Sequence, residues 1–161
     1  MPATQYLNRR FDVLALRGAT LRGEVQLNQS LFGAEIGGEV CTGVQKLAQR
    51  WTIEFLTIRG SMPFHLANRG SGFMSAVKRG ILRNEADVQA QYNFAAVVVR
   101  QNLINEETAD MHPEDRFAKA TLLQIQLGPG TLSLVVRIDS QSGEAREVIL
   151  PIALTPVELN L

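Results

Sequence analysis

The most constraining feature of this sequence is a pair of alternating apolar runs around a glycine-proline-glycine turn. Period-two alternation on both sides of a tight turn predicts two antiparallel strands, each with one buried face. A second turn and a third apolar run follow, which extends the hairpin to a meander. The predicted strands are Phe117 to Leu127, Leu132 to Ile138 and Ala145 to Ile152, with turns at Gly128-Pro129-Gly130 and at Ser140 to Gly143.

A helical period precedes the meander. From Glu39 to Ile58, apolar residues recur at three- and four-residue steps and predict an amphipathic helix. Thr42 competes as its N-cap, and we expect Gly60 to end it. Residues 60 to 72 are rich in helix breakers and are typical of a functional or self-packed loop, anchored by Phe64, His65 and Leu66.

Two further helices are expected, a short one from Phe73 to Leu82 and a long one from Glu85 to about Glu107. Asn84 is the expected N-cap of the long helix, supported by Asp87 in its first turn. The run Phe94 to Val99 makes this helix apolar nearly all round at its centre, so we expect burial on more than one side.

These elements predict an α+β fold, in which helices pack on one face of an antiparallel β-meander. Residues 1–37 are punctuated by glycines and predict an extended N-terminal arm or hairpin that packs on a neighbour, with strand character at Phe11 to Leu16. The domain then spans residues 38–152, and residues 153–161 form a C-terminal tail with Pro156, typical of an edge strand or arm.

Composition excludes several classes of protein. Sixteen basic and sixteen acidic residues give zero net charge, which argues against a dedicated nucleic-acid binder. A single cysteine, Cys41, excludes an internal disulfide and a cysteine-built zinc site and is expected to be buried. The longest apolar run, Phe94 to Val99, is too short for a membrane helix, and we expect no signal peptide.

Charge is segregated along the chain. The charged residues from Arg59 to Arg83 are all basic, whereas those from Glu85 to Asp115 are acidic except Arg100. Such segregation favours steered docking of a partner, and ordinary solvated helix faces are the alternative interpretation.

No catalytic constellation stands out. His65 is expected to be a hydrogen-bonded loop residue and His112 to end a helix, and the two histidines show no metal-ligand spacing. Gly70-Ser71-Gly72 lacks the remainder of a phosphate-binding loop. The carboxylates that a glycosidase would need have candidates, but nothing in the sequence selects a pair; these are Glu54, Glu85, Glu114 and Asp115. The sequence therefore implies no metal and no cofactor.

The order of features resembles a known family. A helix with Trp51 leads into the loop from Thr57 to Phe64, a Gly-Ser-Gly-Phe element follows at residues 70–73, and Pro113-Glu114-Asp115-Arg116 precedes the hairpin. This order, over residues 40–152, resembles the baseplate wedge or sheath-initiator family of contractile bacteriophage tails, a lysozyme-like baseplate family shared with type VI secretion baseplates. Asp115 stands where that family has the proline of Glu-Pro-Arg.

The resemblance implies a structural subunit that links the baseplate wedge to the first sheath ring and templates sheath assembly by β-strand exchange, without enzymatic activity. The implied partners are the tail sheath protein, wedge subunits and tube or hub proteins, with six copies around the tail axis in the virion and assembly in the host cytoplasm. No nucleic acid or membrane is implied. The expected partner-binding residues are Glu114, Asp115, Arg116, Phe64, Arg69, Phe11, Val13, Val148 and Leu150.

Two alternatives stay open on the sequence alone. One is a cell-wall glycoside hydrolase of a phage tail, and the other is a different small tail component such as a completion protein. For the leading hypothesis, the strands available for exchange are Phe11 to Leu16 and Ala145 to Leu161.

Overall fold

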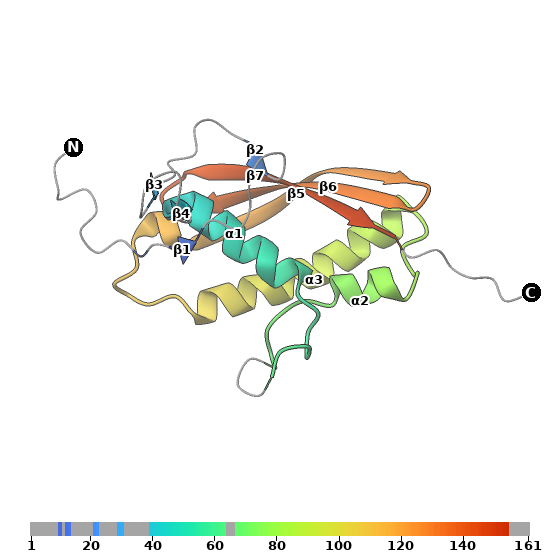
Figure 1. Ribbon diagram of the computed structural model, residues 1–161, viewed down its shortest axis with the longest axis horizontal. Coiled ribbons are helices and arrows are strands. Elements are labelled where there is room, and N and C mark those ends of the chain that lie inside the picture. The colour runs from blue at the N-terminus through green and yellow to red at the C-terminus, as the bar shows by residue number, and fades with distance from the viewer. Residues whose placement is uncertain are drawn as a thin grey trace, which may run out of the picture.

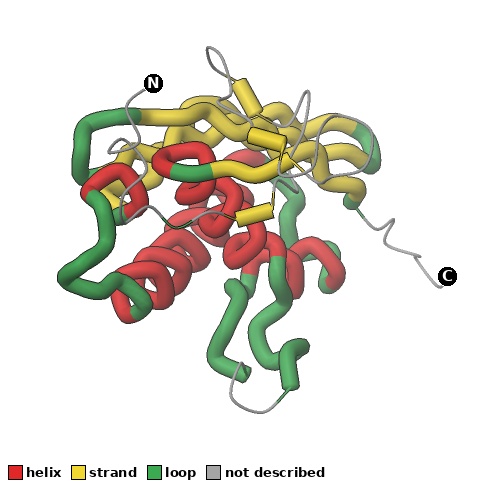
Figure 2. The backbone as a smooth tube through the Cα atoms, turned by 60° about the vertical axis from the view of Figure 1, so that its left-hand side comes forward, coloured by secondary structure: helices red, strands yellow, loops and turns green. Residues whose placement is uncertain are grey.

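A computed structural model describes residues 10, 12–13, 21–22, 29–30, 39–63 and 67–154. Three helices pack on one face of a three-stranded antiparallel meander, and Figure 2 shows the strands and the helices as two layers. The predicted α+β fold is thereby confirmed. The helices are α1 (Gly43–Leu56), α2 (Phe73–Lys78) and α3 (Glu85–Asn105), and the strands are β5 (Phe117–Gly128), β6 (Thr131–Ser140) and β7 (Ala145–Ala153).

Four short strands add to this framework (Figure 1). β2 (Leu21–Arg22) pairs with β7, which gives the main sheet the order β2-β7-β6-β5. A second small sheet has the order β1-β4-β3 and is formed by β1 (Asp12–Val13), β3 (Gln29–Ser30) and β4 (Glu39–Cys41).

The register of the meander sets its two faces. Leu134 of β6 lies between Ile125 of β5 and Leu150 of β7, so these apolar positions share the face that the helices cover. β5 is irregular, because its register shifts between Phe117 and Lys119 and again between Leu122 and Gln124. Such bulges bend and twist an edge strand.

An aromatic cluster fills the core between helices and sheet. The rings of Trp51 and Phe55 stack with centroids 4.8 Å apart, and Phe73 lies 4.7 Å from Phe55. Tyr92 of α3 closes the cluster at 5.7 Å from Phe55. All but Tyr92 are fully buried, and aromatic pairs at these distances stabilise a core beyond the area that they bury.

The first helix is shorter at both ends than predicted. Residues 39–41 form β4, since Val40 pairs with both β1 and β3, and Thr42 is the N-cap. Cys41 is fully buried, as expected. The helix ends at Leu56, so the prediction that Gly60 ends it was wrong; Gly60 has φ +83° in the following turn.

The other helices follow the sequence closely. Asn84 caps α3, because its Oδ1 accepts from the Asp87 backbone N–H at 2.9 Å. The second helix ends at Lys78, four residues before the predicted end, because Gly80 turns the chain with φ +64°. His112 does not end a helix as predicted, but is the N-cap of the short 3-10 helix η4 (Pro113–Asp115).

The described chain buries the long helix on one side only. Val88, Tyr92 and Val99 lie in the core, whereas Phe94 is 71% exposed and Val97 69% exposed. The expectation that this helix is buried on more than one side is therefore wrong for the described residues.

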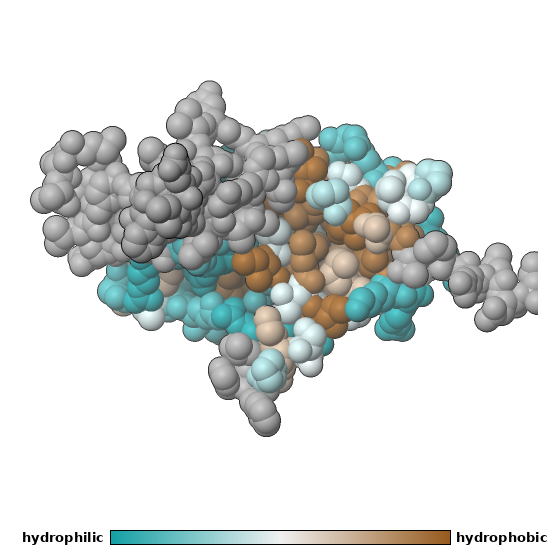
Figure 3. Space-filling model, in the orientation of Figure 1, coloured by the Kyte–Doolittle hydropathy of each residue, from teal (hydrophilic) through white to brown (hydrophobic). Residues whose placement is uncertain are grey.

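The surface also carries apolar residues elsewhere. In the view of Figure 3, hydrophobic residues gather over the centre and right of the molecule, with hydrophilic residues around them. Among the described residues, no helix combines the length and the apolar character that crossing a membrane requires.

Candidate interaction site

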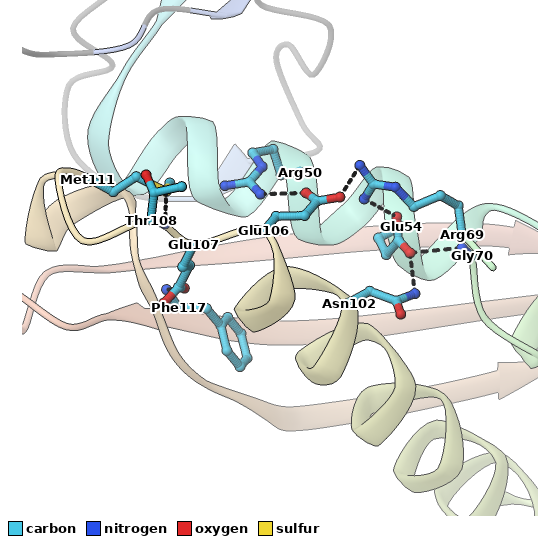
Figure 4. Close-up of polar contacts among 10 residues, drawn as sticks. All are labelled: Arg50, Glu54, Arg69, Gly70, Asn102, Glu106, Glu107, Thr108, Met111 and Phe117. Atoms are coloured by element: carbon cyan, nitrogen blue, oxygen red, sulfur yellow. Dashed lines mark hydrogen bonds and ion pairs between the residues drawn. The ribbon is translucent and has the colours of Figure 1, made fainter. Parts of the chain in front are cut away.

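A charged network joins the C-terminal halves of α1 and α3 (Figure 4). At its centre is Glu54, which is only 4% exposed. Its carboxylate accepts from the Gly70 backbone N–H at 2.8 Å, from Arg69 Nη1 at 3.1 Å and from the amide of Asn102. A buried carboxylate requires such donors, since an unpaired buried charge is strongly unfavourable.

The network continues through Glu106 at the end of α3. Arg50 Nη2 lies 2.8 Å from Glu106 Oε2, and Arg69 pairs with the other carboxylate oxygen of Glu106. Arg69 belongs to the basic stretch of the sequence and Glu106 to the acidic one. Part of the segregated charge is thus used inside the molecule, around a small pocket of about 190 Å³ that Arg50, Glu54, Arg69 and Glu106 help to line.

The network holds the neck of the loop between α1 and α2. The Ser71 N–H donates to Thr57 O at 2.9 Å, and the Arg59 N–H donates to Ser71 O at 3.1 Å. Gly70 has φ +90°, and a Cβ there would lie 2.5 Å from Thr57 O, so only glycine allows this approach. Figure 2 shows the loop projecting away from the two layers.

The loop contained two of the predicted partner-binding residues. Arg69 forms ion pairs with Glu54 and Glu106, so its charge stabilises the neck of the loop. Phe64 and its predicted neighbours His65 and Leu66 lie outside the described residues.

Glu114 packs against the beginning of α1. A Cβ on Gly43, the first residue of α1, would lie 3.0 Å from Glu114 Oε2. Gly43 has φ +62°, so both backbone and space favour glycine there. A carboxylate at this end of a helix is stabilised by the helix dipole.

Asp115 is 2% exposed and lies in a polar cluster under the same end of α1. Lys46 in this cluster donates from Nζ to Arg10 O at 2.9 Å. Burial lowers the pKa of Lys46, and the charge of Asp115 opposes that shift. Burial, with Asp12 nearby, raises the pKa of Cys41 to about 11.

Arg116 closes the turn that connects α3 to β5. Its Nη2 donates to Thr108 O at 3.0 Å and to Ala109 O at 2.6 Å, and its carbonyl accepts from the Gln141 N–H at 3.0 Å. Glu107 fixes the start of β5 by accepting from the Phe117 N–H at 2.6 Å. The guanidinium of Arg116 therefore stabilises the turn between α3 and β5 within its own chain.

The same turn reaches the N-terminal segment through an exposed ion pair. Arg10 Nη2 lies 3.2 Å from Asp110 Oδ2. The Thr108 hydroxyl, bonded to Asp110, lowers the pKa of that carboxyl, and Arg10 adds to the effect.

The predicted exchange strands have partners within the chain. Val13 belongs to β1 and pairs with Val40 of β4. Val148 and Leu150 of β7 are 0% and 1% exposed and belong to the core. Val148 is paired on both sides, by β6 and by β2, so of these two positions only the backbone of Leu150 is available to a partner. Phe11, residues 14–16 and residues 155–161 lie outside the described residues.

The carboxylates considered for hydrolysis do not converge. Glu54 lines the small pocket described above, Glu85 lines a separate groove at the β5–β6 hairpin, and Glu114 sits at the start of α1. Within the part of the chain that the structure describes, no three His, Cys, Asp or Glu residues form a group that could hold a metal ion.

Sequence reasoning missed the network around Glu54. Its signals were present: Glu54 interrupts the apolar stripe of α1, and Arg69 stands in a loop between two glycine-rich turns. Nothing in the sequence pairs the two residues, since they are 15 positions apart and meet only in the folded loop.

Comparison with protein-family models, with curated proteins and with solved structures found no match.

Proposed function

We propose that this protein is a structural subunit of a contractile bacteriophage tail baseplate, which links the wedge to the first sheath ring and templates sheath assembly by β-strand exchange. The order of sequence features supports the proposal. The structural observation that carries it is the main sheet, whose two rims offer unpaired backbone among the described residues.

One rim is β5, a strand of 12 residues, which among the described residues pairs only with β6. A long edge strand is a template for another chain. Its two bulges and Lys119, the one charged residue of β5, are features by which natural edges limit unwanted pairing. We infer that this rim accepts a selected strand.

The other rim is formed by β2 and by the part of β7 that extends beyond β2. β2 pairs with β7 only at Glu147 and Val148, so residues 149–153 have no partner strand on that side in the described chain. Backbone N–H and C=O groups along such a stretch can bind an added strand, and backbone hydrogen bonds supply much of the affinity in this mode of recognition.

The N-terminal strand is short. β1 has 2 residues, and the polar contacts nearby include Gln49 Nε2 donating to Asp12 Oδ2 at 3.3 Å, Lys46 Nζ donating to Arg10 O, and the exposed pair of Arg10 with Asp110. Exposed ion pairs contribute little to stability. A strand held in this way can be replaced by the same segment of a neighbour, which is the exchange that we propose.

The wedge contact is proposed at the turn of Glu114, Asp115 and Arg116. Because Arg116 bonds within the chain, Glu114 packs on Gly43 and Asp115 is buried, we propose that they shape the turn that the wedge binds. Partners in this proposal are the sheath protein, wedge subunits and tube or hub proteins, with six copies around the tail axis of the virion.

Two deletions test strand exchange in co-expression with the sheath protein of the same particle. Removal of residues 1–16 or of residues 153–161 is expected to abolish sheath assembly, scored by electron microscopy, while circular dichroism shows a folded core. Removal of residues 1–9 is the matched control, since it spares Asp12 and Val13, and it is expected to leave assembly intact. Normal sheath in both longer deletions would contradict strand exchange.

A peptidoglycan-clearing assay separates the structural proposal from the glycoside hydrolase. We expect no clearing by the purified protein. Clearing that disappears with Glu54→Gln, Glu85→Gln or Glu114→Gln, in a variant that remains folded, would support hydrolysis and contradict the proposed role.

A further inference from the structure

The start of α1 presents a row of hydrogen-bond donors to the N-terminal segment. Thr42, Lys46 and Gln49 follow steps of four and three residues, so their side chains lie along one side of the helix start. Lys46 is 7% exposed and Gln49 is 1% exposed. Donors with so little access to water need acceptors from protein, because an unpaired buried donor is unfavourable.

The N-terminal segment supplies these acceptors. The Arg10 carbonyl accepts from Lys46 Nζ at 2.9 Å and from the Thr42 hydroxyl at 3.4 Å. The Asp12 carboxylate accepts from Gln49 Nε2 at 3.3 Å. These bonds join residues 32 to 37 positions apart, so the donors and the acceptors belong to separate parts of the chain.

Two further contacts fix how the segment lies. β1 pairs antiparallel with β4, which sets Val13 opposite Val40, and Arg10 pairs with Asp110 at 3.2 Å. In an extended strand, residues two positions apart point to the same side, as the charged side chains of Arg10 and Asp12 then do. The segment therefore combines a basic residue, a carboxylate two positions later and a strand residue after it.

We propose that Thr42, Lys46, Gln49 and Asp110, with the edge of β4, form a recognition site for such a segment, and that the segment of a second copy of this chain fills it when copies lie close together. The inference rests on the strand exchange proposed above and names the residues that select the exchanged strand. Exchange of an identical element between copies preserves each contact.

Proximity decides which copy supplies the segment. A tethered segment competes at an effective concentration on the order of mM, so the chain's own segment fills the site in dilute solution. Neighbours in the proposed ring of six copies reach similar local concentrations. The buried donors disfavour an empty site, and zero net charge removes long-range repulsion between copies.

A second copy fits the site better than an unrelated strand. Any strand offers a backbone carbonyl to Lys46. Only a strand with a basic residue two positions before a carboxylate satisfies Asp110 and Gln49 together. Charges placed in this way select partners more than they raise affinity.

Disulfide trapping tests the exchange with full-length chains. One chain carries Val13→Cys and the other Val40→Cys, both with Cys41→Ala, because directly opposed positions of antiparallel strands lie within disulfide range. The expected result is a disulfide-linked heterodimer whose yield rises from dilute protein to about 1 mM. A chain with both cysteines is expected to close the bond within itself in dilute solution.

Lys119→Cys, an exposed thiol outside the segment, replaces Val13→Cys in the control mixture and is expected to give little heterodimer. A heterodimer yield no higher than this control at about 1 mM overturns the exchange. A chain with both cysteines that leaves them reduced overturns the site itself, since β1 and β4 would not pair in the stated register.

Reciprocal placement of Asp12→Ala tests the selection. On the Val13→Cys chain it weakens the incoming segment, so the heterodimer yield is expected to fall about fivefold, the change equivalent to one net hydrogen bond. On the Val40→Cys chain it weakens the resident segment, so the yield is expected to rise by a similar factor. Equal yields for the two placements overturn recognition of the carboxylate.

These outcomes are distinct from those of the sheath assembly experiment. Normal sheath from a chain that gives no heterodimer would overturn exchange between copies and leave the baseplate role standing. A trapped heterodimer together with failure of sheath assembly would support the recognition site and contradict the baseplate role.

Discussion

The inner and outer faces of α3 carry similar side chains in opposite surroundings. Leu103 is 1% exposed and its neighbour Ile104 is 38% exposed, while Tyr92 is 3% exposed and Phe94 71%. The comparison shows that an apolar pattern predicts burial of a helix face but does not identify what covers it. One face is covered by α1 and the sheet, and the other is exposed in the described chain.

The largest expected effect is the difference in stability between alanine variants of two adjacent residues of similar size. Leu103→Ala is expected to lower the free energy of unfolding by about 3 kcal/mol, since it removes buried methyl groups and leaves a cavity. Ile104→Ala, the matched control, is expected to change it by less than about 0.5 kcal/mol at low protein concentration. Urea unfolding measures both, and equal losses would contradict the assignment of the faces.

The next effect concerns the network that sets how α3 lies on α1. Glu54→Ala leaves the Gly70 N–H and the Arg69 guanidinium without their shared acceptor, so the free energy of unfolding is expected to fall by about 2 kcal/mol. Glu144→Ala, at an exposed turn, is the control. If both variants unfold at the same urea concentration, Glu54 does not hold the helices together.

Much of the fold was predictable because its signals are local. Alternation around Gly128-Pro129-Gly130 defined the meander, and Asn84 with Asp87 defined the start of α3. Local periodicity predicts a helix at residues 39–41, because Val40 fits the apolar period, yet Val40 pairs with two strands that are distant in sequence. Tertiary pairing outweighed local periodicity there.

The candidate site was less predictable, since its contacts join distant segments. Glu114, Asp115 and Arg116 were recognisable as a charged group, but their roles depend on Gly43, Lys46 and the carbonyls of Thr108 and Ala109. The sequence identifies the charged residues but not the groups that they contact in the fold.

Alkaline pH is expected to lower the free energy of unfolding through ionisable groups that are buried in the core. Burial raises the pKa of Cys41 to about 11 and also raises the pKa of Tyr92 on the inner face. Above about pH 9 the thiol ionises in the unfolded chain while the folded chain keeps its proton, so stability is complete below that pH and is lost as the pH approaches the folded value. Lys46, whose pKa is lowered by burial, acts in the opposite direction.

Urea unfolding at about pH 8 and about pH 10.5 measures this dependence. Cys41 is expected to account for about 2 kcal/mol of the loss, from the difference between its ordinary and raised pKa. The variant Cys41→Ala is therefore expected to lose less stability over this range than the wild type. An identical loss in both proteins would contradict a protonated buried thiol.

The smallest expected effect is at the helix caps. Asn84→Ala is expected to lower the free energy of unfolding by about 1 kcal/mol, because its side chain accepts from the first turn of α3. Thr42 occupies the N-cap of α1 without a side-chain capping bond, so Thr42→Ala is expected to cost less. A larger loss for Thr42→Ala than for Asn84→Ala would contradict this ranking of the two caps.

Hydroxyl-radical footprinting of two phenylalanines tests the two-faced helix most directly. In dilute solution, Phe94 is expected to oxidise rapidly and the fully buried Phe73 slowly. The expected contrast follows from the exposure of each ring in the described chain. Equal oxidation rates for Phe94 and Phe73 in a folded protein would contradict the account.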